Sequence, residues 1–246
     1  MKIDLNPSLD LNSLTTEYAI DKRLQIRDFL VEQSANEIYG KLNQLPWGLT
    51  YNEGQQVHEL ALEQVKNLTP TEIQEIGQKV QSGAAEGYQF LYNYYPLLAR
   101  YFDRALRHEE MFDVFEFVNS PAFLNFVRKL TGLDDILWAD AHATLYRAGH
   151  FLKFHTDESP TEKRLAAYVL NFTRDWGRDW GGLLQFWDKK YDVELAYRPI
   201  FNGLNIFTIP ADHSVSMVTS YCPGMRFSVT GWLRGDALPQ SIPFRS

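Results

Sequence analysis

The pattern of hydrophobic and polar positions changes near residue 132. Before this point, apolar residues recur mainly every three or four positions, as on one face of a helix. After it, short apolar or alternating runs are separated by Gly, Pro, Asn and Asp, which is typical of strands. No linker rich in Pro, Gly or Ser divides the chain. We therefore predict a single domain over residues 1–246, with a helical part over about 1–132 and a β-core over about 133–238.

Three segments of the first part carry signals for the ends of helices. A side chain that caps the first turn, a proline at the first helical position and a glycine after the last turn are the expected marks. A fourth segment, 88–103, is apolar and aromatic and breaks at Pro96. The three segments are 24–45, with Ser34 and Glu37 at capping-box spacing, 68–83, with Thr69, Pro70 and a terminal Gly83, and 119–132, with Ser120, Pro121 and a terminal Gly132.

Six runs of the second part are predicted to be strands. Their regular spacing with turn residues between them is the pattern of an antiparallel sandwich or barrel. The fold class is therefore α+β with a mainly β core and helices packed outside it. The runs are 135–149, 164–172, 181–188, 203–210, 213–221 and 225–235.

Composition and charge exclude several classes of function. The chain has a net charge of −7, which argues against general affinity for nucleic acid or an anionic membrane but allows a basic peptide as a partner. One cysteine, Cys222, excludes an internal disulfide and a cysteine-rich zinc site. No apolar run reaches the length of a membrane span, and the first residues lack the apolar segment of a secretory signal. We expect a cytoplasmic protein.

The segment FLKFHTDESP, residues 151–160, holds His155 and Asp157 two positions apart. In an extended segment residues i and i+2 point to the same side, so both side chains could face one metal ion. Two histidines and one carboxylate leave three coordination positions free, an arrangement that suits Fe(II). His108 and Glu110 have similar spacing, but they lie in helix-like sequence, where this spacing points the side chains apart.

A third metal ligand has to come from a distant segment. The candidate histidines are His58 in a polar, helix-like stretch, His142 in a predicted strand, His150 beside a turn glycine, and His213. His213 follows a buried run and a proline turn and begins another strand, so its position at a strand end gives it the best geometry. A structural histidine that satisfies its hydrogen bonds locally would have the same sequence context.

Arg226 lies in the run MRFSVTGWL. Alternation puts Arg226, Ser228, Thr230 and Trp232 on one face of the strand, and apolar residues on the other. A buried guanidinium needs an anion and fits a carboxylate through two hydrogen bonds. On an edge strand, the same residue would face water and need no partner.

Four segments in this order resemble the Fe(II)/2-oxoglutarate-dependent dioxygenase superfamily, in its prolyl 4-hydroxylase-like branch. Within that branch, the ending of the chain is similar to that of the ribosomal-protein prolyl hydroxylases. The resemblance implies a double-stranded β-helix, a jelly-roll or cupin-like core of two sheets. The segments are HTD at 155–157, the run 164–188, IPADHSV at 209–215 and RFSVTGWLRG at 226–235.

The resemblance implies roles for seven residues. His155, Asp157 and His213 match the metal ligands and catalytic centre, and Arg226 matches the residue that holds the remote carboxylate of 2-oxoglutarate. Fe(II), 2-oxoglutarate and O2 are the implied cofactors, with ascorbate as a further candidate. Tyr146, Ser228 and Tyr168 match the cosubstrate pocket, although some relatives place a tyrosine one residue after Tyr168.

The implied activity is hydroxylation of an unactivated C–H bond, with release of succinate and CO2. The expected substrate is a prolyl residue in a protein or peptide. The negative net charge of this chain is compatible with a basic polypeptide as substrate. Three alternatives stay open: a free amino acid or small metabolite as substrate, a metal-dependent β-barrel enzyme that does not use 2-oxoglutarate, and a binding module without catalysis. Trp176, Trp180 and Trp187 are candidates for the wall of a substrate groove or for core filling.

Overall fold

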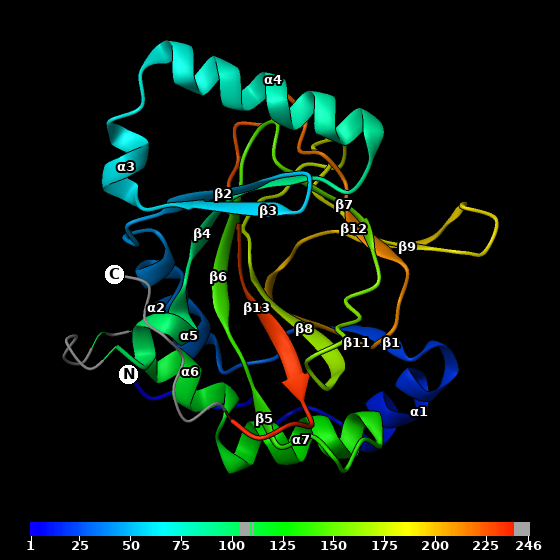
Figure 1. Ribbon diagram of the computed structural model, residues 1–246. Coiled ribbons are helices and arrows are strands. Elements are labelled where there is room, and N and C mark those ends of the chain that lie inside the picture. Colours follow the sequence, from blue (N-terminus) through cyan, green and yellow to red (C-terminus); the bar gives the residue numbers. More distant parts are fainter. Residues whose placement is uncertain (104–108, 110, 239–246) are drawn as a thin grey trace.

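The computed structural model describes residues 1–103, 109 and 111–238 and has a mixed α+β fold. Helices lie outside a large antiparallel sheet, as Figure 1 shows. Two of them, α1 and α7, pack side by side below the sheet in that view, and α4 runs across its top. The helices are α1 (Leu11–Asp21), α2 (Glu32–Leu42), α3 (Leu62–Lys66), α4 (Pro70–Glu86), α5 (Leu97–Tyr101), α6 (Phe112–Val118) and α7 (Pro121–Thr131).

The strands form one twisted sheet that nearly closes on itself. Its order is β1-β11-β8-β13-β6-β4-β7-β12-β9-β10, with β2 paired to β4, β3 paired to β2, and β5 paired to β13. This arrangement confirms the predicted double-stranded β-helix. The strands are β1 (Arg23–Ile26), β2 (Gly48–Glu53), β3 (Gln56–Leu60), β4 (Phe90–Tyr95), β5 (Trp138–Ala139), β6 (His142–Tyr146), β7 (Phe151–His155), β8 (Arg164–Phe172), β9 (Leu184–Trp187), β10 (Val193–Tyr197), β11 (Phe201–Thr208), β12 (His213–Val215) and β13 (Arg226–Arg234).

The N-terminal part is less helical than the sequence predicts, because it contributes β1 to β4 to the sheet. Residues 90–95, whose aromatic run was grouped with the helices, form β4 and pair with β2, β6 and β7. Pro96 ends that strand, and α5 follows it directly. Since both parts of the chain pair within the same sheet, the observed topology supports the prediction of a single domain, which stays a prediction.

Both predicted ends hold for α7 and the predicted start holds for α4, whereas the predicted end of α4 and the predicted cap of α2 are wrong. The Thr69 hydroxyl accepts a hydrogen bond from the Glu72 amide, and the Glu72 carboxylate accepts one from the Thr69 amide, which is a capping box. This helix continues past Gly83 to Glu86. In α2, the helix begins at Glu32, so Ser34 lies within its first turn and instead accepts a hydrogen bond from the Asp4 amide.

Helix α7 follows the sequence signals at both ends. The Ser120 hydroxyl accepts from the Phe123 amide, Pro121 opens the helix, and Gly132 closes it with φ of 71° in the left-handed region that glycine adopts without strain. The apolar face of α7 buries Phe123, Leu124, Phe126, Val127 and Leu130.

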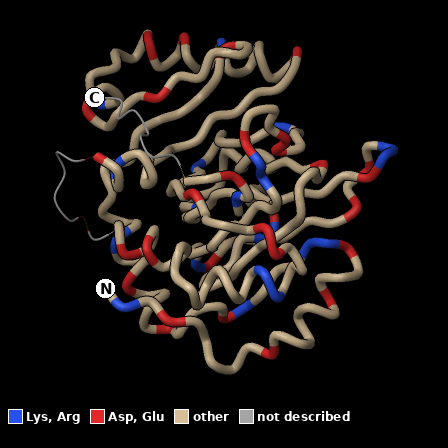
Figure 2. The backbone as a smooth tube through the Cα atoms, turned by 60° about the horizontal axis from the view of Figure 1, so that its bottom comes forward, with Lys and Arg blue, Asp and Glu red and all other residues tan. Residues whose placement is uncertain are grey.

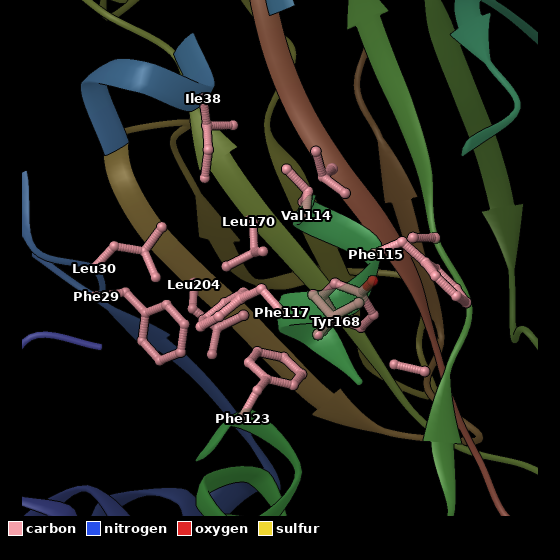
Figure 3. Packing of buried hydrophobic residues seen from close by; sticks show 14 of the residues in the cluster. Phe29, Leu30, Ile38, Val114, Phe115, Phe117, Phe123, Tyr168, Leu170 and Leu204 are labelled. Carbon is pink, nitrogen blue, oxygen red and sulfur yellow. The ribbon is translucent and has the colours of Figure 1, made fainter. Parts of the chain in front are cut away.

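The main hydrophobic core lies between the sheet and the helices. Figure 3 shows residues from the helical segments meeting residues of β8 and β11, such as Leu170 and Leu204. Phe29 packs edge-on against Phe123 with 6.2 Å between ring centroids. Because this core takes side chains from both parts of the chain, the helices fix the sheet from its outer face.

Strands β8 and β13 carry the two faces of the sheet in alternation. In β13, Phe227, Val229 and Leu233 belong to the main core, as the alternation predicts. The opposite face of β13 carries Arg226 and Ser228, which line a cavity inside the sheet. This cavity is the place where the candidate chemistry gathers.

Charged residues are interspersed by sign over much of the chain, as the red and blue segments of Figure 2 show. None of the helices in the described ranges combines the length and the apolar character that crossing a membrane requires. His108 and Glu110, the rival pair with metal-ligand spacing, lie outside the described residues.

Candidate metal centre

The structure brings together His155 and Asp157, which lie two positions apart, and His213 from a distant segment of the chain. One ligand atom of each lies within 4.8 Å of the others. Nε2 of His155 is 3.3 Å from Oδ1 of Asp157, and Nε2 of His213 is 3.3 Å from Oδ2 of the same carboxylate. Within the described ranges, no other three His, Cys, Asp or Glu side chains converge in this way. Two imidazole nitrogens and one carboxylate are a ligand set that suits Fe(II).

Strand pairing and one left-handed residue produce this convergence. His155 ends β7, and His213 begins β12 directly opposite it in the antiparallel register. The two rings therefore lie with centroids 4.0 Å apart. Asp157 lies beyond the end of β7 with φ of 63°. The sequence argument expected the simple alternation of an extended segment, whereas this turn is what points the carboxylate back to the histidines.

Backbone carbonyls orient both imidazole rings. Nδ1 of His155 lies 2.9 Å from the carbonyl oxygen of Lys153, and Nδ1 of His213 lies 2.7 Å from that of Ala211. A carbonyl only accepts, so each Nδ1 carries a hydrogen, and each Nε2 is the ring atom that faces Asp157. Histidines that bind metals commonly have this outer hydrogen bond, because it fixes the tautomer and the ring orientation.

Asp157 stays ionised despite its shielded position. Burial alone would raise the pKa of its carboxyl, but the imidazoles of His155 and His213, each 3.3 Å from one of its oxygens, hold that pKa far below its ordinary value. Its backbone carbonyl accepts a hydrogen bond of 3.3 Å from Arg164, which fixes the turn. The centre therefore presents one carboxylate charge and two imidazole nitrogens, a set of atoms that can bind a cation.

A cavity of about 390 Å³ extends from these three residues into the sheet. Arg226 lies in its wall and is only 2% exposed. Nε and Nη1 of its guanidinium are buried without a hydrogen-bond partner. Burial lowers the pKa of Arg226, although an arginine remains charged at neutral pH. Such a buried, incompletely paired cation needs an anion, and the cavity is where that anion would lie.

Tyr146 and Ser228 lie beside Arg226. The guanidinium carbon of Arg226 is 4.9 Å from the centre of the Tyr146 ring, and the two residues are opposite each other in the β13–β6 register. The hydroxyls of Ser228 and Thr144 are 2.7 Å apart and hydrogen-bonded, and both line the cavity. These two hydroxyls and the guanidinium therefore form a cluster of polar groups in the wall of the cavity.

Tyr168 does not face the cavity. It lies on the helix-facing side of β8, fully buried in the main core, where its ring packs against Phe123 with 5.7 Å between centroids. Its hydroxyl donates a 2.7 Å hydrogen bond to the carbonyl of Asp140. Because strand side chains alternate, its neighbour Val169 lines the cavity instead. The expectation that Tyr168 binds the cosubstrate is therefore wrong in this structure.

None of the three tryptophans proposed for a substrate groove lines this cavity, although Trp176 packs in one cluster with Tyr146 and Val215, which do. Trp176 packs against Trp180, and its indole NH donates to the carbonyl of Gly181, while the indole NH of Trp187 donates to the hydroxyl of Ser214. Trp232 lines the cavity instead, with the Arg164 guanidinium 3.5 Å above its ring. The alternation that predicted the direction of Arg226 also contained Trp232, so this residue could have been found from the sequence.

The other candidate histidines take different positions. His142 lines the cavity, where burial lowers its pKa to about 4. His58 lies in strand β3, not in a helix, stacked on Tyr51. His150 is half-buried in the turn after β6, and burial lowers its pKa to about 4, so it is less solvated than its glycine neighbour suggests.

Comparison with known proteins agrees with this site. Residues 141–234, which contain the three-residue cluster and Arg226, match the family described as the 2OG-Fe(II) oxygenase superfamily. The match covers the β-core and not the N-terminal part of the chain. Over this segment the chain is similar to 2OG-Fe(II)-dependent oxygenases. A comparison with curated proteins finds no significant match.

Solved structures share the fold at low sequence identity. A Pseudomonas putida prolyl-4-hydroxylase is 16% identical, with a TM-score of 0.57 over 91% of this chain and 98% of the other. A 2OG-Fe(II) oxygenase family oxidoreductase from Burkholderia pseudomallei is 10% identical, with a TM-score of 0.59 over 93% and 92%. A Trichoplax adhaerens prolyl hydroxylase, solved with a peptide fragment, is 15% identical, with a TM-score of 0.55 over 92% and 89%. These likenesses concern the fold alone.

Proposed function

We propose that this enzyme hydroxylates a prolyl residue within a protein or peptide, using Fe(II), 2-oxoglutarate and O2. The observation that carries the proposal is the buried Arg226 guanidinium, with two unpaired nitrogens, in the same cavity as the His155, Asp157 and His213 cluster. A keto acid with a second carboxylate would place its keto end at a metal ion held by the cluster and its second carboxylate at Arg226. The prolyl substrate is supported by the fold shared with two prolyl hydroxylases, one of which was solved with a peptide.

His155, Asp157 and His213 are the residues that would hold the metal. Their Nε2 atoms and carboxylate come together from two segments of the chain, and a metal ion held by these three residues would keep positions free for other ligands. Fe(II) bound together with 2-oxoglutarate supplies the oxidation of a C–H bond by O2, which yields succinate and CO2. The protein contributes the orientation of the reactants and the exclusion of bulk water.

Arg226 would set the direction in which the keto acid binds. Its fork of N–H donors matches a carboxylate, and burial strengthens that interaction because water does not compete for it. Tyr146 packs against the guanidinium and restricts its position, and Ser228 offers a further hydroxyl in the same wall. Leu152, Val169 and Val215 supply apolar wall on other strands. The cosubstrate would then bind in one orientation, with its keto end toward the metal ligands.

The test is turnover by the purified protein loaded with Fe(II) under controlled oxygen. We expect succinate to form in step with the gain of one oxygen atom on a proline of a peptide substrate, as located by tandem mass spectrometry. Succinate formation with a free amino acid but with no peptide would replace the polypeptide substrate by a small one. A metal-dependent reaction without consumption of 2-oxoglutarate would contradict the proposal.

A further inference from the structure

The cavity at the metal centre continues into two further hollows. It shares Tyr92, His142 and Trp232 with a neighbouring hollow of about 440 Å³. That hollow in turn shares five residues with a third one of about 670 Å³, which reaches the edge strand β3 and the helices α3 and α5. The shared residues of the last two are Val57, Glu59, Tyr94, Pro96 and Ala99.

Strand register places these residues on one face of the sheet. Directly paired residues of antiparallel strands project to the same side, as do residues two apart in a strand. Thr230 pairs with His142, and Thr144, two residues along β6, pairs with Tyr94. Tyr92, two residues before Tyr94, pairs with Thr50, which pairs with Glu59 on β3. The face that carries the metal-centre cavity therefore continues across β6, β4 and β2 to Glu59.

The opposite face of this extension is covered. Leu49, Leu60 and Leu91 pack with Ile76 and Val80 of α4 on that side. Figure 1 shows α4 lying along the outer side of β2 and β3. The hollow that ends at Glu59 is thus on the side of the sheet that α4 leaves open, in continuity with the cavity of the metal centre.

Rings form the floor of this extension. The centroid of the Trp232 ring is 6.2 Å from that of His142, and the His142 centroid is 6.0 Å from that of Tyr94. Tyr92 lies alongside them and stacks on Tyr146 with 5.1 Å between centroids. Beyond the rings, Val57 is 53% exposed. A row of flat aromatic rings can pack against the apolar side chains and the backbone of an extended polypeptide.

Glu59 closes the far end with a negative charge. Its side chain is exposed on β3, and none of the cations in the described part of the chain pairs with it. The other carboxylates of the connecting hollow, Asp140 and Glu162, are paired with Arg234. Residues 50–86 carry six acidic and two basic side chains, so the potential around Glu59 is negative.

From these observations we propose that Trp232, His142, Tyr92, Tyr94, Val57 and Glu59 form one groove, the flanking groove, which binds a polypeptide substrate beside its reacting residue. The bound segment is extended, and a Lys or Arg side chain of it pairs with Glu59. The inference rests on the proposed function, since the reacting residue has to lie at the metal centre. A small substrate would fill the first cavity and leave the flanking groove without a role.

The strand spacing gives the distance between the reacting residue and the basic residue. Neighbouring strands lie about 4.8 Å apart, so the three to four strand steps from β7 or β12, which carry the metal-ligand histidines, to β3 span roughly 14–19 Å. An extended chain rises about 3.3 Å per residue, so the basic residue lies roughly four to six positions from the reacting one. The preference applies to one side of the reacting residue only, because the groove leaves the metal centre in one direction.

The test is a binding scan with the metal-loaded protein, using Mn(II) in place of Fe(II), and 2-oxoglutarate. Short labelled peptides with a central proline in an alanine–serine background carry one arginine, which is moved one position at a time, and Kd is measured by fluorescence anisotropy. We expect affinity to peak with arginine about four to six positions from proline on one side. Glu59→Gln should abolish the peak, a loss of about three- to fivefold. Glu75→Gln, a matched change on α4 behind the sheet, should keep it.

Charge reversal sharpens the result. Glu59→Arg should move the preference to a glutamate at the same peptide position, which a loss of folding would not do. A flat profile, or a peak that survives in Glu59→Gln, would overturn the flanking groove. Succinate release by the Fe(II) enzyme is measured separately. Its absence with all peptides would contradict the proposed function, whereas turnover with a flat arginine profile would contradict the groove alone.

Discussion

The two faces of the central strands differ in whether they are complete. On the helix side, Val229 of β13 and Leu170 of β8 are buried among other apolar side chains of the main core. On the cavity side, the same β13 carries Arg226, whose Nε and Nη1 have no partner. One face therefore needs nothing beyond the chain, and the other is built around charges that only a ligand would satisfy.

This difference teaches that stability and function are separable on the same strands. Substitutions on the helix side should lower the free energy of unfolding and leave the affinity for metal and 2-oxoglutarate unchanged. Substitutions on the cavity side should lower the affinity for metal or 2-oxoglutarate without lowering the free energy of unfolding. Some of them should raise that free energy. The following predictions test this separation in order of expected size.

The largest effect is expected for His155→Ala. Removal of one of three ligands should weaken metal binding by more than about 100-fold and abolish turnover, because the remaining donors cannot fix the ion. Metal content after dialysis and succinate release measure the two effects. His150→Ala, a change of the same kind outside the cluster, should retain both. Full turnover in His155→Ala would refute its role as a ligand.

Arg226→Met should separate binding from stability. Loss of the guanidinium should weaken 2-oxoglutarate binding by about 100-fold while the metal is retained, because a buried charge pair is worth several kcal/mol when one partner is removed. Without ligands, the same variant should be more stable than the wild type by about 1–2 kcal/mol, since an incompletely paired buried cation is replaced by an apolar side chain. Calorimetric titration and chemical denaturation give the two numbers. An unchanged cosubstrate affinity would assign Arg226 another role.

Leu170→Ala is the matched change on the helix side. The side chain is 1% exposed in the main core, and its truncation should lower the free energy of unfolding by about 3 kcal/mol through lost burial and a cavity. The dissociation constant of 2-oxoglutarate, measured below the unfolding transition, should stay within error of the wild type. A large loss of cosubstrate affinity would show that the two faces are coupled.

The pH dependence of stability should contain a contribution from His142. Burial lowers its pKa to about 4 in the folded protein, from an ordinary value of 6.5. The unfolded chain therefore binds more protons between these values, and stability is lost as pH falls from about 6.5 to 4. Burial raises the pKa of Asp140 to about 7, which opposes this loss. Denaturation of metal-free His142→Asn across this window should show about 1–2 kcal/mol less destabilisation than the wild type. If the free energies of unfolding of wild type and variant run parallel across this pH window, His142 makes no such contribution.

The smallest predicted effect concerns Tyr168→Phe. Its hydroxyl donates to the Asp140 carbonyl inside the core, so its removal should cost about 1 kcal/mol of stability. Affinity for 2-oxoglutarate should not change, because Tyr168 lies on the helix side. A drop in that affinity would restore Tyr168 to the cosubstrate pocket.

The sequence predicted the β-core well because its strands are punctuated and alternate clearly. The run 164–172 is β8 without any shift, and the two faces of β13 follow the predicted alternation. It failed where strands lie among helices, as in the aromatic β4 and the polar β3. Local patterns do not reveal pairing with strands that are distant in the sequence, such as the pairing of β4 with β6 and β7.

For the site, spacing and the family resemblance selected the residues that converge, but not how they converge. The left-handed φ of Asp157 has no mark in its sequence, and alternation alone would have given a different geometry. The residue of β8 that lines the cavity is Val169 and not Tyr168. The resemblance did not fix which of these two neighbours points into the cavity. The flanking groove depends on strand pairing across four strands, which no short motif encodes.

The most direct test of the central claim is the affinity for 2-oxoglutarate with and without a divalent metal, measured under exclusion of oxygen. If His155, Asp157, His213 and Arg226 serve one bound keto acid, metal and 2-oxoglutarate must strengthen each other's binding by the same factor. We predict that this coupling is large in the wild type, is lost in His155→Ala and persists at weaker affinity in Arg226→Met. Equal affinity for 2-oxoglutarate in the presence and absence of metal would contradict the account.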